Sequence, residues 1–193
     1  MNVKWKKCTA GICALIMAVT SLTMSTFTPV RATNQEQNVL VSEAILVESG
    51  MCGENLTWEW YDDGNLVIQG EGAMDDYANF ADTPWYDIAN NVNAILVQGG
   101  TSIGTNAFYN CMAACSLTIG ETVETIGAEA FANCNCINEV ILPKNVSFIG
   151  ERAFSAAVFY ADSCKIEIWN PNCEIYDAER TFYENFTIYG YDG

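Results

Sequence analysis

Three eight-residue stretches of this chain repeat one pattern at a constant spacing. Each contains an Ile-Gly pair followed by Ala-Phe, and the pairs begin at Ile103, Ile126 and Ile149, which are 23 residues apart. The stretches are residues 101–108, 124–131 and 147–154. A constant period of this size is typical of stacked coils, in which each coil buries its apolar side chains against the next. We therefore predict a repeat solenoid, whose extended surface is suited to binding.

The segments between these stretches alternate apolar and polar residues, which indicates short strands with one buried face. We predict one parallel strand and short helical turns in each coil, in a mainly β fold. The strands are residues 94–97, 116–119, 139–142 and 165–168. Their inward rows are Ile95/Leu117/Val140/Ile166 and Val97/Ile119/Leu142/Ile168, beside Ile103/Ile126/Ile149 and Phe108/Phe131/Phe154. Gly104, Gly127 and Gly150 recur with the same period, which indicates a positive φ or a close backbone approach.

Both ends of the repeat differ from its middle, as expected of capping segments. Residues 52–60 and 66–68 alternate around an Asp62-Asp-Gly-Asn turn and predict a β-hairpin over the first coil. A short helix is expected after Pro84, with Trp85 in the core. At the other end Tyr176 replaces the repeat glycine, and the Ala-Phe pair is lost. The predicted divisions are a lead-in at 33–50, an N-terminal cap at 51–93, coils at 94–169 and a cap coil at 170–193.

The chain opens with three lysines, an apolar run and a small-residue site ending at Ala32. We interpret residues 1–32 as a signal peptide, with an uncleaved anchor as the alternative. The chain has 24 acidic and 8 basic residues and a net charge of −16. Removal of the leader would take four of the basic residues and leave the remainder still more acidic. Such a surface repels nucleic acid and anionic lipid, so we expect an extracellular protein with no membrane insertion after cleavage.

Two of the nine cysteines lie in the predicted leader, so seven remain. Cys111 and Cys134 are one period apart, and we interpret them as buried thiols stacked on each other. Two pairs are candidates for disulfides in an exported protein, namely Cys164 with Cys173 and Cys115 with Cys136. Zinc binding by Cys111, Cys115, Cys134 and Cys136 is a weaker alternative, because zinc sites use wider spacings and often histidine.

The chain has no histidine, which excludes imidazole acid–base chemistry and the usual serine and cysteine triads. It also has no glycine-rich phosphate loop before a helix. Paired carboxylates could still hydrolyse a glycoside, so a glycoside hydrolase stays the least favoured alternative. We predict no catalytic residues, no metal site and no cofactor.

The repeat resembles the BspA-type leucine-rich repeat of bacterial surface proteins. The resemblance rests on Ile126-Gly, Ala130-Phe131, Asn133-Cys134 and Leu142-Pro143. The opening Cys52-Gly-x-Asn-Leu-Thr-Trp58 and the closing Asn170-Pro-Asn-Cys173 are similar to the caps of that family. The resemblance implies a secreted or cell-surface protein with a leucine-rich-repeat solenoid, used for adhesion or protein–protein binding and without shared catalytic residues.

An extracellular protein, of a host or of a cell surface, is therefore the expected partner. We predict that it meets the sheet residues that point away from the core: Thr118, Glu139, Ile141, Lys165, Glu167 and Trp169. Ile141 and Trp169 are the expected anchors, because large apolar and aromatic side chains dominate interfaces. The alternative for Trp169 is packing beneath the C-terminal cap. The alternative function is a structural spacer or cap within a larger wall-attached protein.

Overall fold

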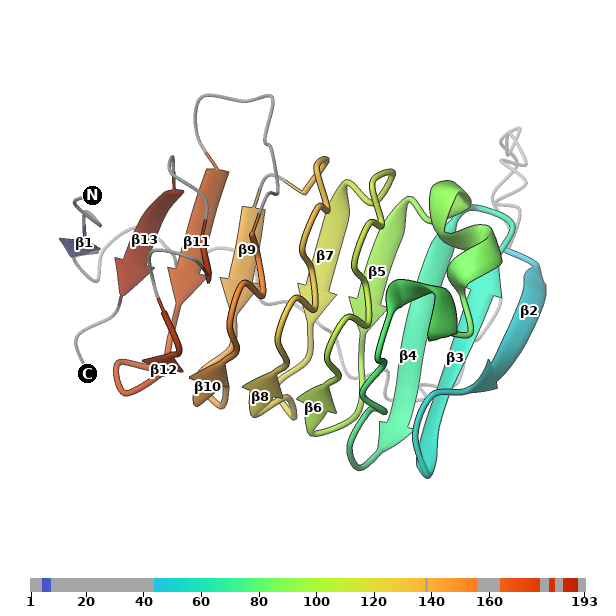
Figure 1. The fold of residues 1–193 in the computed structure, drawn as a ribbon, viewed down its shortest axis with the longest axis horizontal. Coiled ribbons are helices and arrows are strands. Elements are labelled where there is room, and N and C mark those ends of the chain that lie inside the picture. Colours follow the sequence, from blue (N-terminus) through green and yellow to red (C-terminus); the bar gives the residue numbers. More distant parts are fainter. Residues whose placement is uncertain are drawn as a thin grey trace, which may run out of the picture. The chain divides into compact units, whose positions relative to one another are not determined.

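The computed structural model describes residues 5–7, 44–137, 139–155, 164–177, 181–182 and 186–190, which belong to one compact unit. In this unit successive coils stack side by side, each with a long strand and a short one (Figure 1). Most of the predicted signal peptide and lead-in lies outside these residues. Within the described parts of the chain, no helix has the length and apolar character needed to cross a membrane.

The long strands of the coils run parallel to one another. They are β5 (Ala94–Val97), β7 (Ser116–Ile119), β9 (Glu139–Leu142) and β11 (Cys164–Ile168). The first three have the predicted bounds, and β11 begins one residue early. Beyond β11 come β13 (Phe186–Gly190) and then β1 (Trp5–Lys7), both parallel to their neighbours. The short strands form a second parallel sheet of β6 (Ser102–Ile103), β8 (Thr125–Ile126), β10 (Phe148–Ile149) and β12 (Glu174–Ile175).

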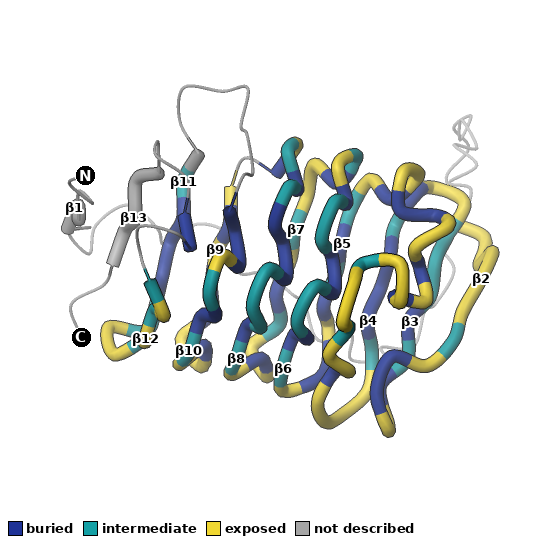
Figure 2. The backbone as a smooth tube through the Cα atoms, in the orientation of Figure 1, coloured by how far each residue is buried: buried dark blue, intermediate teal, exposed yellow. Residues whose placement is uncertain are grey.

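The register of these sheets confirms the predicted rows. Ile95 lies opposite Leu117, and Val140 lies opposite Ile166, with the second inward row two residues further along each strand. Leu117 is half-buried, whereas the other members of both rows are buried. Figure 2 shows the resulting alternation of buried and exposed positions along β9. Because like residues meet at each step, every coil contributes the same apolar surface to one continuous core.

A row of stacked aromatic rings runs through that core. Phe108 and Phe131 have ring centroids 5.3 Å apart, and Phe131 and Phe154 have centroids 5.2 Å apart, with nearly parallel planes in both pairs. Trp85 extends the row at one end, 5.1 Å from Phe108, and Phe182 extends it at the other, 5.8 Å from Phe154. The ring expected to be lost from the last coil is therefore present. Phe182 was missed because it follows Phe154 by more than one regular period.

The recurring glycines are explained by close backbone approach and not by a positive φ. A Cβ added at Gly127 would lie 2.6 Å from the backbone nitrogen of Thr105, and one at Gly150 would lie 2.6 Å from that of Ala128. The left-handed conformation instead falls two residues later in each coil. It occurs at Asn106, Glu129 and Arg152, which have φ values of 56°, 53° and 56°. The glycine thus lets neighbouring coils touch, and the following turn reverses the chain.

The N-terminal cap contains the predicted hairpin, formed by β3 (Asn55–Tyr61) and β4 (Asn65–Glu71). The end of the expected loose lead-in forms a further antiparallel strand, β2 (Leu46–Met51). Strand β4 pairs with β5 and so joins the cap to the first coil. Two short 3₁₀ helices follow, η1 (Phe80–Asp82) and η2 (Tyr86–Asn91). Trp85 is fully buried, as predicted, and its Nε1 donates a 2.8 Å hydrogen bond to the Ala107 carbonyl.

Candidate functional site

The long strands present an outer face, which we define by the side chains of Thr118, Glu139, Ile141, Lys165, Glu167 and Trp169. Lys165 lies opposite Glu139, and Glu167 lies opposite Ile141, in the register of β9 and β11. Strand β7, which carries Thr118, packs beside β9. The fold therefore brings together all six residues that the sequence predicted on neighbouring strands.

Three of these residues are open to solvent. Thr118 and Glu139 are exposed, and Ile141 keeps 43% of its surface accessible. They are exposed because the strand alternation turns their neighbours Ile119, Val140 and Leu142 into the core. The centre of the outer face thus combines one large apolar side chain with polar groups.

Glu167 departs from the exposure expected of it. Only 4% of the residue is accessible, although its strand position points away from the core. Its carboxylate forms an ion pair with Lys165 and accepts a 3.2 Å hydrogen bond from Trp169 Nε1. Lys165 also reaches Glu139 Oε1 at 3.3 Å. The hydrogen bond that Lys165 donates to Glu167, with the further contact to Glu139, holds the pKa of Lys165 above its usual range.

These contacts divide the outer face into two parts. Trp169 is half-buried and its indole is hydrogen-bonded to Glu167. It therefore belongs to this polar cluster and is less accessible as an anchor than the sequence predicted. Removing one partner of a nearly buried ion pair leaves the other charge uncompensated, which destabilises the fold. Glu167 and Lys165 are therefore positioning residues for the face, whereas Ile141, Glu139 and Thr118 are available for contact.

The cysteines separate into buried and exposed groups. Cys111 and Cys134 are buried one coil apart, as predicted, and Cys134 Sγ lies 3.0 Å from the Phe108 carbonyl. Burial raises the pKa of the Cys111 thiol to about 12. Cys115 and Cys136 are exposed, so the four cysteines of the zinc interpretation do not meet at one point. Among the described residues, no three histidine, cysteine, aspartate or glutamate side chains are grouped to hold a metal ion.

Both predicted disulfides are absent as bonds from the described part of the structure. Cys115 and Cys136 are free thiols, but they are hydrogen-bonded to each other, which raises the pKa of Cys115. The fold thus brings this pair together, and an oxidised protein can still link them. Cys173 is a free, half-buried thiol, and burial with the charge of Glu174 raises its pKa to about 11. The side chain of Cys164 lies outside the described part of the chain.

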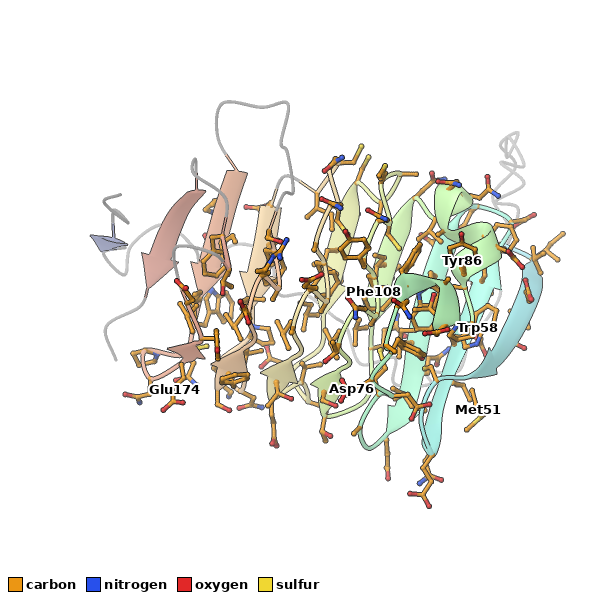
Figure 3. The ribbon with its side chains drawn as sticks, in the orientation of Figure 1. Met51, Trp58, Asp76, Tyr86, Phe108 and Glu174 are labelled. Atoms are coloured by element: carbon orange, nitrogen blue, oxygen red, sulfur yellow. The ribbon has the colours of Figure 1, made fainter. Side chains whose placement is uncertain are left out.

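The sequence did not predict a groove where the N-terminal cap meets the first coil. It has a volume of about 630 Å³, and its lining includes the rings of Phe80, Tyr86 and Tyr109. Tyr86 projects from η2 (Figure 3). The repeat does contain one indication of this groove. Ala132 and Ser155 occupy the position of Tyr109 in the next two coils, so this tyrosine departs from the repeat.

Comparison with known proteins agrees with this architecture. A family model described as the BspA type leucine rich repeat region matches residues 86–186 in six copies. The fold is similar to the crystal structure of a leucine-rich repeat protein from Eubacterium ventriosum, with a TM-score of 0.55 and 22% sequence identity. The similarity covers 76% of this chain and 44% of that one, so this chain spans less than half of that protein's length. No curated protein matches the chain.

Proposed function

Because the chain belongs to the BspA-type leucine-rich repeat family, we propose that it is a secreted or cell-surface module that binds an extracellular protein without catalysing a reaction. The partner contacts the outer face of the long-strand sheet, in an adhesive or protein–protein role. The family is a repeat-based binding family and is typically extracellular, which supports both parts of the proposal. The acidic composition supports a protein partner over a nucleic acid or an anionic membrane, because both of these would be repelled.

The observation that carries the proposal is the position of Ile141 in the outer face. This large apolar side chain stays 43% exposed at the centre of β9, beside the exposed Glu139 and Thr118. Pairing with β11 on one side and packing beside β7 on the other hold the backbone beneath it. A surface that is ordered before binding loses little conformational entropy when a partner docks. An apolar centre within a polar surround is also the usual anatomy of a protein interface.

The test is binding of purified protein to immobilised basement-membrane extract and to immobilised mucin. Two variants alter the outer face, Ile141→Ser and Glu139→Lys. Two matched controls make the same changes elsewhere: Ile45→Ser, at a residue 64% exposed directly before β2, and Glu174→Lys, at the exposed end of β12 (Figure 3). All four positions are solvent-facing, so thermal stability should change little. Glu139→Lys also removes the 3.3 Å contact with Lys165, so its melting temperature is measured together with its binding.

We expect both outer-face variants to weaken binding by about tenfold or more, and both controls to bind like the unaltered protein. Equal binding by all five proteins would remove the outer face from recognition. If the unaltered protein bound neither surface, the chain would be better explained as a structural spacer. Release of reducing sugar from mucin would instead favour the glycoside hydrolase alternative.

A further inference from the structure

Three aromatic side chains line part of the open groove between the N-terminal cap and the first coil. Phe80 contacts Tyr86 edge to face, with ring centroids 5.4 Å apart, and Tyr109 at a tilt, with centroids 6.4 Å apart. Tyr86 is 48% exposed, whereas Phe80 and Tyr109 are half-buried. The groove volume of about 630 Å³ lies within the range that small-molecule sites occupy. The rings therefore offer apolar surface to a ligand of small-molecule size.

The floor of the groove is held in place by asparagines in fixed turns. Asn106 Nδ2 donates to the Tyr77 carbonyl at 2.9 Å, which ties the cap loop to the coil. Asn110 accepts a 2.8 Å hydrogen bond from Asn133 Nδ2 through its Oδ1. Asn106 and Asn110 are both left-handed, with φ values of 56° and 60°, so the turns that carry them are closely defined. A floor of this kind is formed before any ligand arrives.

These bonds leave polar groups of both kinds for a ligand. The Nδ2 of Asn110 and the hydroxyls of Tyr86 and Tyr109 have no hydrogen bond to a described residue, and each can donate. The Oδ1 of Asn106 and the same two hydroxyls can accept. Aromatic faces interleaved with amide and hydroxyl groups suit a molecule that carries both C–H faces and hydroxyls.

The charges of the residues that line the groove restrict the charge that a ligand can carry. Glu129 is the charged member of the described lining, and this carboxylate already faces Arg152 Nη1 at 3.5 Å. No lysine or arginine is among the described residues that line the groove, and the chain has a net charge of −16, so an anionic ligand would be repelled. A strongly cationic ligand would lack an unpaired carboxylate among these lining residues. The groove therefore favours a neutral ligand.

We propose that this groove is a binding site for a neutral oligosaccharide. The faces of Tyr86 and Tyr109 pack against the C–H faces of sugar rings, and Asn110 donates to a sugar hydroxyl. The site is formed by η1, η2 and the turns after β6 and β8, and shares no residue with the outer face of the long-strand sheet. The protein thus has a second binding surface, in addition to the one that the proposed function uses.

The test is isothermal titration calorimetry of the full chain with three neutral probes: cellotetraose, mannotetraose and triacetylchitotriose. Trigalacturonic acid and a tetra-arginine peptide serve as the anionic and cationic comparisons. Tyr109→Ala places in the first coil the residue that the second coil has at this position, so the fold should tolerate it. Asn110→Asp keeps an acceptor for Asn133 and removes the free donor. Tyr176→Ala is the control, at a tyrosine 64% exposed outside the groove.

We expect at least one neutral probe to bind at micromolar to millimolar concentration, and Tyr109→Ala and Asn110→Asp each to weaken it about tenfold. Tyr176→Ala should leave the affinity unchanged. Absence of binding by all three neutral probes at millimolar concentration would overturn the proposal. So would sugar binding that both groove variants leave intact, or binding of the arginine peptide alone.

Discussion

The coils and the N-terminal cap both bury aromatic rings in the same row, but they do so in different ways. In the coils the rings are Phe108, Phe131 and Phe154, which come at one spacing and stack almost parallel. In the cap a single ring, Trp85, continues the stack and is held from the sides by Trp58 and Tyr77, both edge to face. Each coil ring is thus stabilised by equivalent rings in neighbouring coils. The cap ring Trp85 is stabilised in addition by two aromatic residues that have no counterpart in the repeat.

This difference explains where binding surfaces can arise in the molecule. A repeated coil repeats its surface, so the outer face is regular and varies through single positions such as Ile141. The junction between cap and coil is not repeated, and it holds the aromatic groove beside Tyr109. Irregular segments on a rigid scaffold are where binding residues concentrate. The contacts indicate that the coils and the cap depend on their rings to different degrees, which substitutions of these rings can test.

The largest effect should come from Phe131→Ala, in the middle of the ring row. Phe131 is fully buried and stacks on both sides, so the change removes two ring contacts and opens a cavity within the core. We expect the free energy of unfolding to fall by about 3–5 kcal/mol in urea titrations. Tyr176→Ala, at an exposed ring, should cost less than about 0.5 kcal/mol. Similar costs for the two variants would contradict the role of the row.

Trp85→Phe tests how much the cap's own ring and its hydrogen bond contribute to stability. The smaller ring can still stack on Phe108, but it cannot donate to the Ala107 carbonyl, which would be left without this partner. We expect a loss of about 1–3 kcal/mol in the same urea titrations. A loss as large as that of Phe131→Ala would mean that the cap and the coils do not differ as described.

Substitutions of Asn133 test the hydrogen bond between asparagines of neighbouring coils. This residue has a φ of 62° and donates to Asn110, so Asn133→Ala removes the bond and also strains the backbone. Asn133→Gly removes the same bond without the strain. We expect the alanine variant to lose about 1–2 kcal/mol more than the glycine variant, measured by thermal and urea unfolding. Equal losses would show that the left-handed backbone carries no cost for alanine here.

The last prediction concerns a loss of stability in alkali. The buried Cys111 thiol keeps its proton until about pH 12, whereas the unfolded chain releases it near the ordinary value of 9.0. Its contribution is therefore complete below pH 9.0 and is lost as the pH rises toward about 12. Cys111→Ala should make the fall in unfolding free energy over this interval shallower. An unchanged slope would exclude Cys111 as a source of the pH dependence.

The sequence predicted the coils well because the pattern that builds them is local and repeated. Leu117, Val140 and Ile166 could be placed in one row from the sequence, since their spacing and alternation determine the register. Phe182 could not, because extra residues precede it and break the period. The burial of Glu167 was missed because strand alternation says which way a side chain points, and not what covers it.

The candidate sites were predictable only in part, for the same reason. The outer face follows from strand alternation, so Ile141 and Glu139 were identified from the sequence. The groove depends on contacts between Phe80 in the cap and Tyr109 in the first coil, which are far apart in the chain and obey no repeat. The proximity of Cys115 and Cys136 was predictable in part. The repeat period brings the turns that carry them together, but it does not determine whether the two thiols are bonded.

The most direct test of the stacked arrangement is a proton NOE measurement on protein with labelled phenylalanine rings. The structure predicts strong contacts between the rings of Phe108 and Phe131 and between those of Phe131 and Phe154, because their centroids are 5.3 and 5.2 Å apart. It predicts no contact between Phe108 and Phe154, since Phe131 lies between them. A contact between Phe108 and Phe154, or the absence of either predicted contact, would contradict the in-register stacking of the coils.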